Sequence, residues 1–291
     1  MFRTRLLSGI VLVVLAFVSI WCGGPVLAAV LCVMSEIAYR ELTKATGVHT
    51  DGVKVNGLEI VGHGLIAFYY LLLWYDMYSM AFNTEYYNIT ITFFVILSFL
   101  VFMFFYVIKF PVYKAGQVMA AFFELIYAPV LLSFLYIIRE TFDTGFKLVW
   151  LVFLCSWGSD TCAYCVGVLF GKHKMAPKLS PKKSIEGAIG GVVGAALLFG
   201  LYIQFVPNLF YTGMDRPNWI ESMWFGAIGA VVSMIGDLAA SAIKRDHNIK
   251  DYGNLIPGHG GIMDRFDSVI VAAPIIFLEL GLMIERGMMR A

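Results

Sequence analysis

Long apolar runs separated by short polar segments constrain the fold of this chain more than any other feature. A membrane-spanning helix needs about 20 predominantly apolar residues, and seven runs come close to that length. They are residues 62–82, 88–108, 116–138, 148–170, 185–206, 219–240 and 268–285. Two shorter runs, 6–20 and 26–38, precede them and form either two thin spans or a re-entrant hairpin. We read the first run as a retained span, and the polar, glycine-bearing segment 39–61 as a loop.

The composition supports a membrane protein. Of 291 residues, 60% are hydrophobic and 14% are charged, whereas an ordinary soluble domain has about 25% charged residues. All five cysteines lie in apolar stretches, so a disulfide framework is not expected. The net charge of +1 says nothing about partners, and no nucleic-acid partner is expected. The sequence therefore predicts an all-α polytopic membrane protein with about nine transmembrane helices.

Charge distribution predicts the orientation, because cytoplasmic loops carry an excess of Lys and Arg. With a cytoplasmic N-terminus and nine crossings, both charged loops, 171–184 and 241–267, lie on the cytoplasmic side, and a re-entrant first pair changes only the count. Of the 21 lysines and arginines, those left outside are Arg139, Lys147, Arg216, Arg286 and Arg290. We expect an N-terminal transmembrane region, 1–140, and a C-terminal catalytic region, 141–291, in the inner or cell membrane, with the active site at cytoplasmic loops and inner helix ends.

The stretch 241–268 differs in composition from the rest of the chain. It mixes aspartates with lysines and arginines around the run Pro257-Gly258-His259-Gly260-Gly261, which proline and glycines keep from being a regular helix. Carboxylates suit Mg²⁺, Lys and Arg suit phosphate, and glycines allow close backbone approach. The stretch thus indicates metal-assisted phosphate chemistry, and His259 is a candidate for the shell of the site.

Two aspartates inside or at the end of spans are candidates for this site. Asp160 lies about ten residues from the end of its span, on the order of 15 Å deep, among small polar residues; the alternative role is to pair with a buried cation. Asp237 closes the span 219–240, and Ser241 and Lys244 follow on the same helix face. Intramembrane acids are functional candidates by default, although an ordinary charged helix end remains the alternative at Asp237.

Acids and bases elsewhere complete the candidate set. Asp264 and Asp267 share a face at the start of the last span, where a helix N-terminus attracts acids in any case. The lysine-rich segment 171–187 either binds phosphate or reflects the positive-inside rule and lipid headgroups. Ser184 is a reasonable helix start, and the following glycines, spaced as GxxxG, indicate close helix packing.

These residues resemble the signature of the phosphatidate cytidylyltransferase (CDP-diacylglycerol synthase) family. The resemblance covers roughly the C-terminal half, and the segments 157–164, 171–174, 180–187 and 236–238 fit it as well. Ser184 stands where many members have Thr, which keeps the hydroxyl. The matching positions in the main motif are Ser241, Lys244, Arg245, Lys250, Asp251, Pro257, Gly258, His259, Gly260, Gly261, Asp264, Arg265, Asp267 and Ser268.

The resemblance implies the transfer of a cytidylyl group from CTP to phosphatidate at the cytoplasmic face, giving CDP-diacylglycerol and pyrophosphate. It implies Mg²⁺ with a monovalent cation such as K⁺, and makes a homodimer plausible. Asp237 and Asp264 are the expected principal metal ligands, with Asp160, Asp251 and Asp267 either as further ligands or in the shell around them. Ser241 is expected either to coordinate the metal or to bind a phosphate. The other residues expected to bind substrate phosphates are Lys183, Ser184, Lys244, Arg245, Lys250 and Arg265.

Two other functions stay open from the residues. A CTP-dependent lipid-alcohol kinase is also multi-spanning, but it releases CDP where a cytidylyltransferase releases pyrophosphate. An ion or phosphate transporter would place its acids at the midplane on broken helices, whereas most acids here lie at one membrane face. The residues do not indicate the acyl-chain preference or the choice between CTP and dCTP.

Overall fold

The computed structural model describes residues 2–49, 55–79, 84–207, 209, 218–258 and 260–285. The chain forms two compact units. The first comprises Met1–Thr141 together with Asp246–Arg265, and the second comprises Phe142–Arg245 together with Phe266–Ala291. The segment around the glycine run therefore packs with the N-terminal part of the chain.

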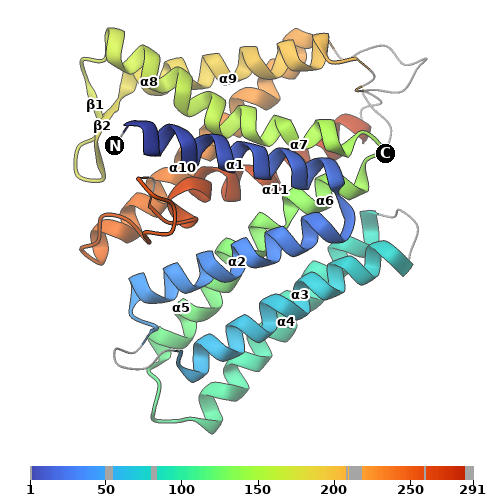
Figure 1. Ribbon diagram of the computed structural model, residues 1–291, viewed down its shortest axis with the longest axis vertical. Coiled ribbons are helices and arrows are strands. Elements are labelled where there is room, and N and C mark those ends of the chain that lie inside the picture. The colour runs from blue at the N-terminus through green and yellow to red at the C-terminus, as the bar shows by residue number, and fades with distance from the viewer. Residues whose placement is uncertain are drawn as a thin grey trace. The chain divides into compact units, whose positions relative to one another are not determined.

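The first unit is a helix bundle. Its elements are α1 (Phe2–Cys22), α2 (Gly24–Thr46), α3 (Gly57–Ser79), α4 (Thr84–Ile108), α5 (Ala115–Leu125), the π-helical segment η1 (Ile126–Val130) and α6 (Phe134–Thr141). Helices α2, α3, α4 and α5 pack against one another (Figure 1). Aromatic side chains fill the core: Tyr69 and Phe94 are fully buried, with ring centroids 4.4 Å apart.

The second unit combines helices with one short hairpin. Its elements are α7 (Gly145–Phe153), the π-helical segment η2 (Leu154–Gly158), α8 (Ser159–Phe170), β1 (Lys174–Ala176), β2 (Ser180–Ser184), α9 (Ile185–Phe205), α10 (Trp219–Asp246) and most of α11 (Met263–Glu285). Strands β1 and β2 are antiparallel, with Lys174 opposite Ser184. In Figure 1, α8 and α9 run side by side and the hairpin joins their ends.

Glycines on α9 bring it close to α8, as the GxxxG spacing predicts. A Cβ added at Gly190 would lie 2.5 Å from the Val166 side chain, and one at Gly194 would lie 2.5 Å from Cys162 Sγ. Small residues let two helix backbones approach closely, which is how apolar helices associate where lipid replaces water. The predicted close packing is confirmed. It holds α8, the helix that carries Asp160, against α9.

Seven helical segments are long and apolar enough to cross a membrane: Gly57–Asp76, Ile89–Ile108, Ala115–Thr141, Gly145–Phe170, Ile185–Phe205, Trp219–Asp246 and Met263–Glu285. They match the seven clear apolar runs, so an all-α polytopic fold is confirmed. The count of nine is not. Within the described residues, α1 contributes only a shorter apolar stretch, Ser8–Cys22. Helix α2 is not apolar enough to count as a membrane span, because polar residues occupy its second half.

Two predicted loops are in part helical. The segment 39–61 was expected to be a loop, but α2 runs to Thr46 and α3 starts at Gly57. Its polar side chains are accommodated inside the bundle: Thr43 Oγ1 donates to Glu59 Oε1 at 3.0 Å, and both residues are buried. The loop 241–267 is likewise shorter than expected, since α10 continues to Asp246 and α11 begins at Met263.

Candidate active site

In the second unit, the lysine-rich hairpin contacts a carboxylate in the C-terminal half of α10. Lys183 on β2 donates through Nζ to Asp237 Oδ2, an ion pair between residues 54 positions apart in the sequence. The side chains are about one quarter exposed, 27% for Lys183 and 24% for Asp237. Partial burial weakens solvent screening of such a pair. The predicted lysine and the predicted carboxylate therefore belong to one site.

Ser184, the next residue, begins α9. Its extended backbone places it at the N-cap position, and its Oγ accepts the backbone N–H of Gly187 at 3.1 Å. Satisfying a free N–H in the first turn is what an N-cap hydroxyl does, so the predicted helix start is confirmed. Glu186 then accepts the backbone N–H groups of Lys172 and His173 and contacts His173 Nδ1 at 2.6 Å, which ties the hairpin to the helix.

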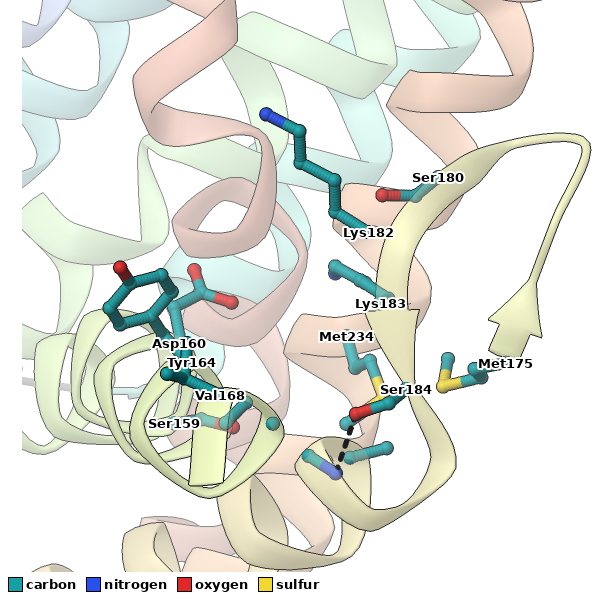
Figure 2. Close-up of a pocket in the computed structure, with 14 residues that line it drawn as sticks. Ser159, Asp160, Tyr164, Val168, Met175, Ser180, Lys182, Lys183, Ser184 and Met234 are labelled. Carbon is teal, nitrogen blue, oxygen red and sulfur yellow. Dashed lines mark hydrogen bonds between the residues drawn. The ribbon is translucent and has the colours of Figure 1, made fainter. Parts of the chain in front are cut away.

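A pocket of about 440 Å³ opens beside the ion pair (Figure 2). Its polar lining includes Asp160 on α8 and Lys182, Lys183 and Ser184 on β2, and its apolar lining includes Val168 on α8 and Met234 on α10. Figure 2 shows the α8 side chains on one side of the pocket and the β2 lysines on the other. A pocket with cations, a carboxylate and apolar wall residues can hold the phosphate end of an amphipathic molecule.

One buried acid of this unit, Asp267, is influenced by two other acids and a lysine. Asp267 on α11 is 7% exposed, and it interacts electrostatically with Asp237, Asp160 and Lys244. Its Oδ1 accepts the backbone N–H of Ser268 at 2.8 Å. The absence of a side chain at Gly236 permits the approach of α11, because a Cβ there would lie 2.9 Å from the Asp267 carbonyl oxygen.

The remaining predicted residues of α10 lie on its last turns. Ser241 is 9% exposed, and Lys244 belongs to the electrostatic cluster around Asp267. Arg245 Nε donates to the carbonyl of Leu179 in the hairpin turn at 3.4 Å. Helix α10 is thus connected to the hairpin at two points, through Asp237 to Lys183 and through Arg245 to Leu179.

A local irregularity precedes Asp160. The π-helical segment η2 ends at Gly158, directly before α8 begins at Ser159. π-Bulges inside helices are frequent at functional sites, because the extra residue re-aims the side chains that follow. Here Asp160 is exposed toward the pocket whereas Ser159 is 4% exposed.

The first unit contains the glycine-run loop. Asp264 Oδ2 accepts the backbone N–H groups of Tyr252 at 2.8 Å and Gly261 at 3.0 Å. Ile256 and Gly260 pair across the turn, and Gly260 has φ +88°, a left-handed conformation that glycine adopts without strain. A second pocket, of about 600 Å³, is lined by Lys250, Asp251, Asn254, Ile256, Gly258, Gly260 and Arg265.

Glu41 on α2 is part of this loop's environment, and sequence reasoning missed it. Its Oε1 accepts the N–H of Ile262 at 3.1 Å and its Oε2 accepts the N–H of Met263 at 2.8 Å. Burial raises the pKa of the Glu41 carboxyl, and the two backbone N–H groups oppose that shift. No local signal could have found it, since the two bonds span 221 and 222 residues.

The predicted site residues fall into two sets. Asp160, Lys183, Ser184, Asp237, Ser241, Lys244, Arg245 and Asp267 lie in the second unit, and Lys250, Asp251, Asp264 and Arg265 lie in the first. His259 lies outside the described residues. Within either unit, no three described His, Cys, Asp or Glu side chains form a group that could hold a metal ion. Lys182 and Tyr164 line the pocket and were not among the predicted site residues.

The fold and these residues define a class of protein: an all-α polytopic membrane protein with acids and cations gathered at helix ends and short loops. The model of the cytidylyltransferase family matches residues 3–283. The chain therefore belongs to the cytidylyltransferase family.

Several curated relatives carry the name phosphatidate cytidylyltransferase. That of Rickettsia conorii is 41% identical over 154 residues, covering 53% of this chain and 66% of the relative. That of Synechocystis is 36% identical over 142 residues, covering 47% and 44%, and that of Mycobacterium tuberculosis H37Rv is 36% identical over 162 residues, covering 48% and 47%. The matched part of the chain thus spans less than two thirds of the length of these relatives.

Proposed function

We propose that this chain transfers the cytidylyl group of CTP to phosphatidate, giving CDP-diacylglycerol and pyrophosphate. The observation that carries the proposal is the pocket that Lys182, Lys183 and Asp160 line together. The chain belongs to the cytidylyltransferase family, and its relatives bear the name of this activity. Cations beside an apolar wall suit the phosphate of a lipid whose acyl chains stay in the bilayer.

The reaction joins two polyanions. An oxygen of the phosphatidate phosphate attacks the α-phosphorus of CTP, the bond from that phosphorus to the bridging oxygen breaks, and pyrophosphate leaves with the electron pair. Because the nucleophile is already an anion, no strong general base is needed. Positioning and electrostatic stabilisation supply most of the catalysis in such transfers.

The cationic side chains provide this stabilisation. In the second unit Lys182 and Lys183 border the pocket, and Lys244 and Arg245 lie at the end of α10. In the first unit Lys250 and Arg265 line the polar pocket. We assign Lys183 and Ser184 to the triphosphate. Binding a phosphate would draw Lys183 from Asp237, so the ion pair keeps the lysine oriented before substrate arrives.

The carboxylates fit magnesium in their donor chemistry. Mg²⁺ is usually bound by one or two carboxylates, with waters and substrate phosphates completing the octahedron, so a group of three acids is not required. In the second unit, Asp237 and Asp267, which interact electrostatically, would hold it, with Asp160 as a further ligand. In the first unit, Asp264 and Asp251 are the proposed ligands. When bound, the ion would neutralise phosphate charge as a Lewis acid and template. A K⁺ ion as second cation and a homodimer remain proposals.

The distribution of Lys and Arg supports an active site on the cytoplasmic side of the inner membrane. Pyrophosphate release by the protein purified in detergent, with CTP, Mg²⁺ and phosphatidate each omitted in turn, tests the proposal. Release that needs all three, with a CDP-lipid product, is expected. CDP release with a lipid alcohol as acceptor would instead identify a kinase, and absence of turnover by folded protein would contradict both.

A further inference from the structure

Outside the proposed catalytic residues, Glu41 is a buried carboxylate with two backbone hydrogen bonds to a distant part of the chain. This residue lies on α2, and its carboxylate contacts a segment more than two hundred residues away in the sequence. Glu41 is 7% exposed. A buried carboxylate is costly unless it is hydrogen-bonded, and here both oxygens accept backbone N–H groups, from Ile262 and from Met263. Such charge-assisted bonds are about twice as strong as neutral ones.

Two glycines make room for this carboxylate. A Cβ added at Gly253 would lie 2.3 Å from Glu41 Oε1, and one at Gly261 would also lie 2.3 Å from it. A side chain at either position would displace the carboxylate from its two donors. The loop is therefore shaped around Glu41 from two sides, which a surface contact would not require.

Asp264 and Glu41 accept hydrogen bonds from neighbouring residues of the same segment. Asp264 Oδ2 accepts the N–H of Gly261, and Glu41 accepts the next two, those of Ile262 and Met263. Two carboxylates thus accept three consecutive N–H groups, two just before α11 and one at its first residue. The second bond to Asp264 Oδ2, from Tyr252, holds the other arm of the loop, so the position of Asp264 depends on the same turn that Glu41 holds.

We propose that Glu41 is a positioning residue, which holds the chain at Ile262 and Met263 from α2 and thereby places Asp264 and Arg265 for the transfer reaction. The expected effect on the reaction rate rests on the proposed function, whereas the contact between Glu41 and the chain at Ile262 and Met263 does not depend on it. A carboxylate is required because two N–H donors need two acceptors. An amide would accept one and turn its own NH₂ toward the other.

The test compares Glu41→Gln with Glu36→Gln, a matched control. Glu36 is an acid on the same helix that contacts His63 on α3. Each variant is purified in detergent as the full chain, and kcat and KM are measured for CTP and phosphatidate, with hydrogen exchange of the segment 250–263. For Glu41→Gln we expect faster exchange in that segment and a kcat lower by about 10- to 100-fold, because a misplacement of about 1 Å can cost 10²-fold. The KM values should change little, and Glu41→Asp, which keeps two acceptors, should recover part of the rate.

Gly253→Ala provides a second route to the same disturbance without altering the carboxylate. It should reproduce the faster exchange and lower kcat, and the double variant with Glu41→Gln should be no worse than the more affected single one, since residues acting through one contact are not additive. Wild-type exchange and kcat in Glu41→Gln, or a loss that follows only the amount of folded protein, would overturn the proposal. If the wild-type chain does not convert CTP and phosphatidate, the proposed function fails, and the exchange experiment alone decides the role of Glu41.

Discussion

Lys183 on β2 forms an ion pair with Asp237 on α10, so a predicted phosphate ligand and a predicted metal ligand contact each other directly. The pair brings the hairpin to the C-terminal half of α10, which also carries Lys244, a lysine that acts electrostatically on Asp267 of α11. Substrate phosphate and Asp237 would compete for the lysine. Substitution of either partner should therefore change the kinetics of the reaction.

Replacement of Asp237 by Asn should lower the turnover rate sharply, and Asp264→Asn should do the same. Charge stabilisation by a metal ion is worth several kcal/mol, and each ~1.4 kcal/mol is a tenfold change in rate, so we expect a loss of about 10²-fold or more. Pyrophosphate release from purified protein measures it, with membrane content checked by immunoblot. The control is Asp246→Asn, because that side chain is 85% exposed at the end of α10. Full activity of either site variant would refute its assignment as a metal ligand.

Replacement of Lys183 by Met should raise the KM for CTP by about tenfold, since a hydrogen bond to a charged group contributes about 1.5–3 kcal/mol. Steady-state kinetics at fixed phosphatidate checks this. Lys178→Met is the matched control: Lys178 is exposed in the hairpin turn, and it is not part of the pocket lining. An equal effect in both variants would mean that the loop acts only through its total charge.

Replacement of Gly190 by Ala should destabilise the second unit by about 1–3 kcal/mol, the usual effect of overpacking. The added Cβ would lie 2.5 Å from Val166 Cβ and would push α9 away from α8. Thermal unfolding in detergent measures the change. Gly281→Ala on α11 has no atom within 4 Å of the added Cβ and should leave stability unchanged or raise it by about 0.4–1 kcal/mol. A neutral Gly190→Ala would show that the two helices are not closely packed.

Removal of divalent cations by EDTA should stop pyrophosphate release, and Mg²⁺ should restore it. Asp267→Asn should require a Mg²⁺ concentration for half-maximal rate that is higher by at least about 10- to 100-fold, because altering even a group that only orients metal ligands costs that much. Titration of the rate with Mg²⁺ at saturating CTP checks this. Undiminished activity in EDTA would exclude a divalent metal from the reaction.

Several features could be predicted from sequence because their signals are local. The seven spans follow from contiguous hydropathy, the start of α9 follows from the hydroxyl at Ser184, and the close contact of α8 and α9 follows from glycines spaced along one helix face. The prediction of a loop at 39–61 is wrong because local signals do not show tertiary partners. Polar residues such as Thr43 suggest a loop, but in the fold Thr43 is buried and hydrogen-bonded to Glu59.

The sequence by itself determined that the chain spans a membrane and which residue types carry its chemistry, because apolar run length and residue type are properties of neighbouring positions. Only the tertiary structure decided which of those residues meet. Lys183 reaches Asp237 across 54 positions, and Glu41 reaches Ile262 across 221. Such contacts depend on how the helices pack, and packing is set by the shapes of surfaces that are assembled from distant parts of the chain.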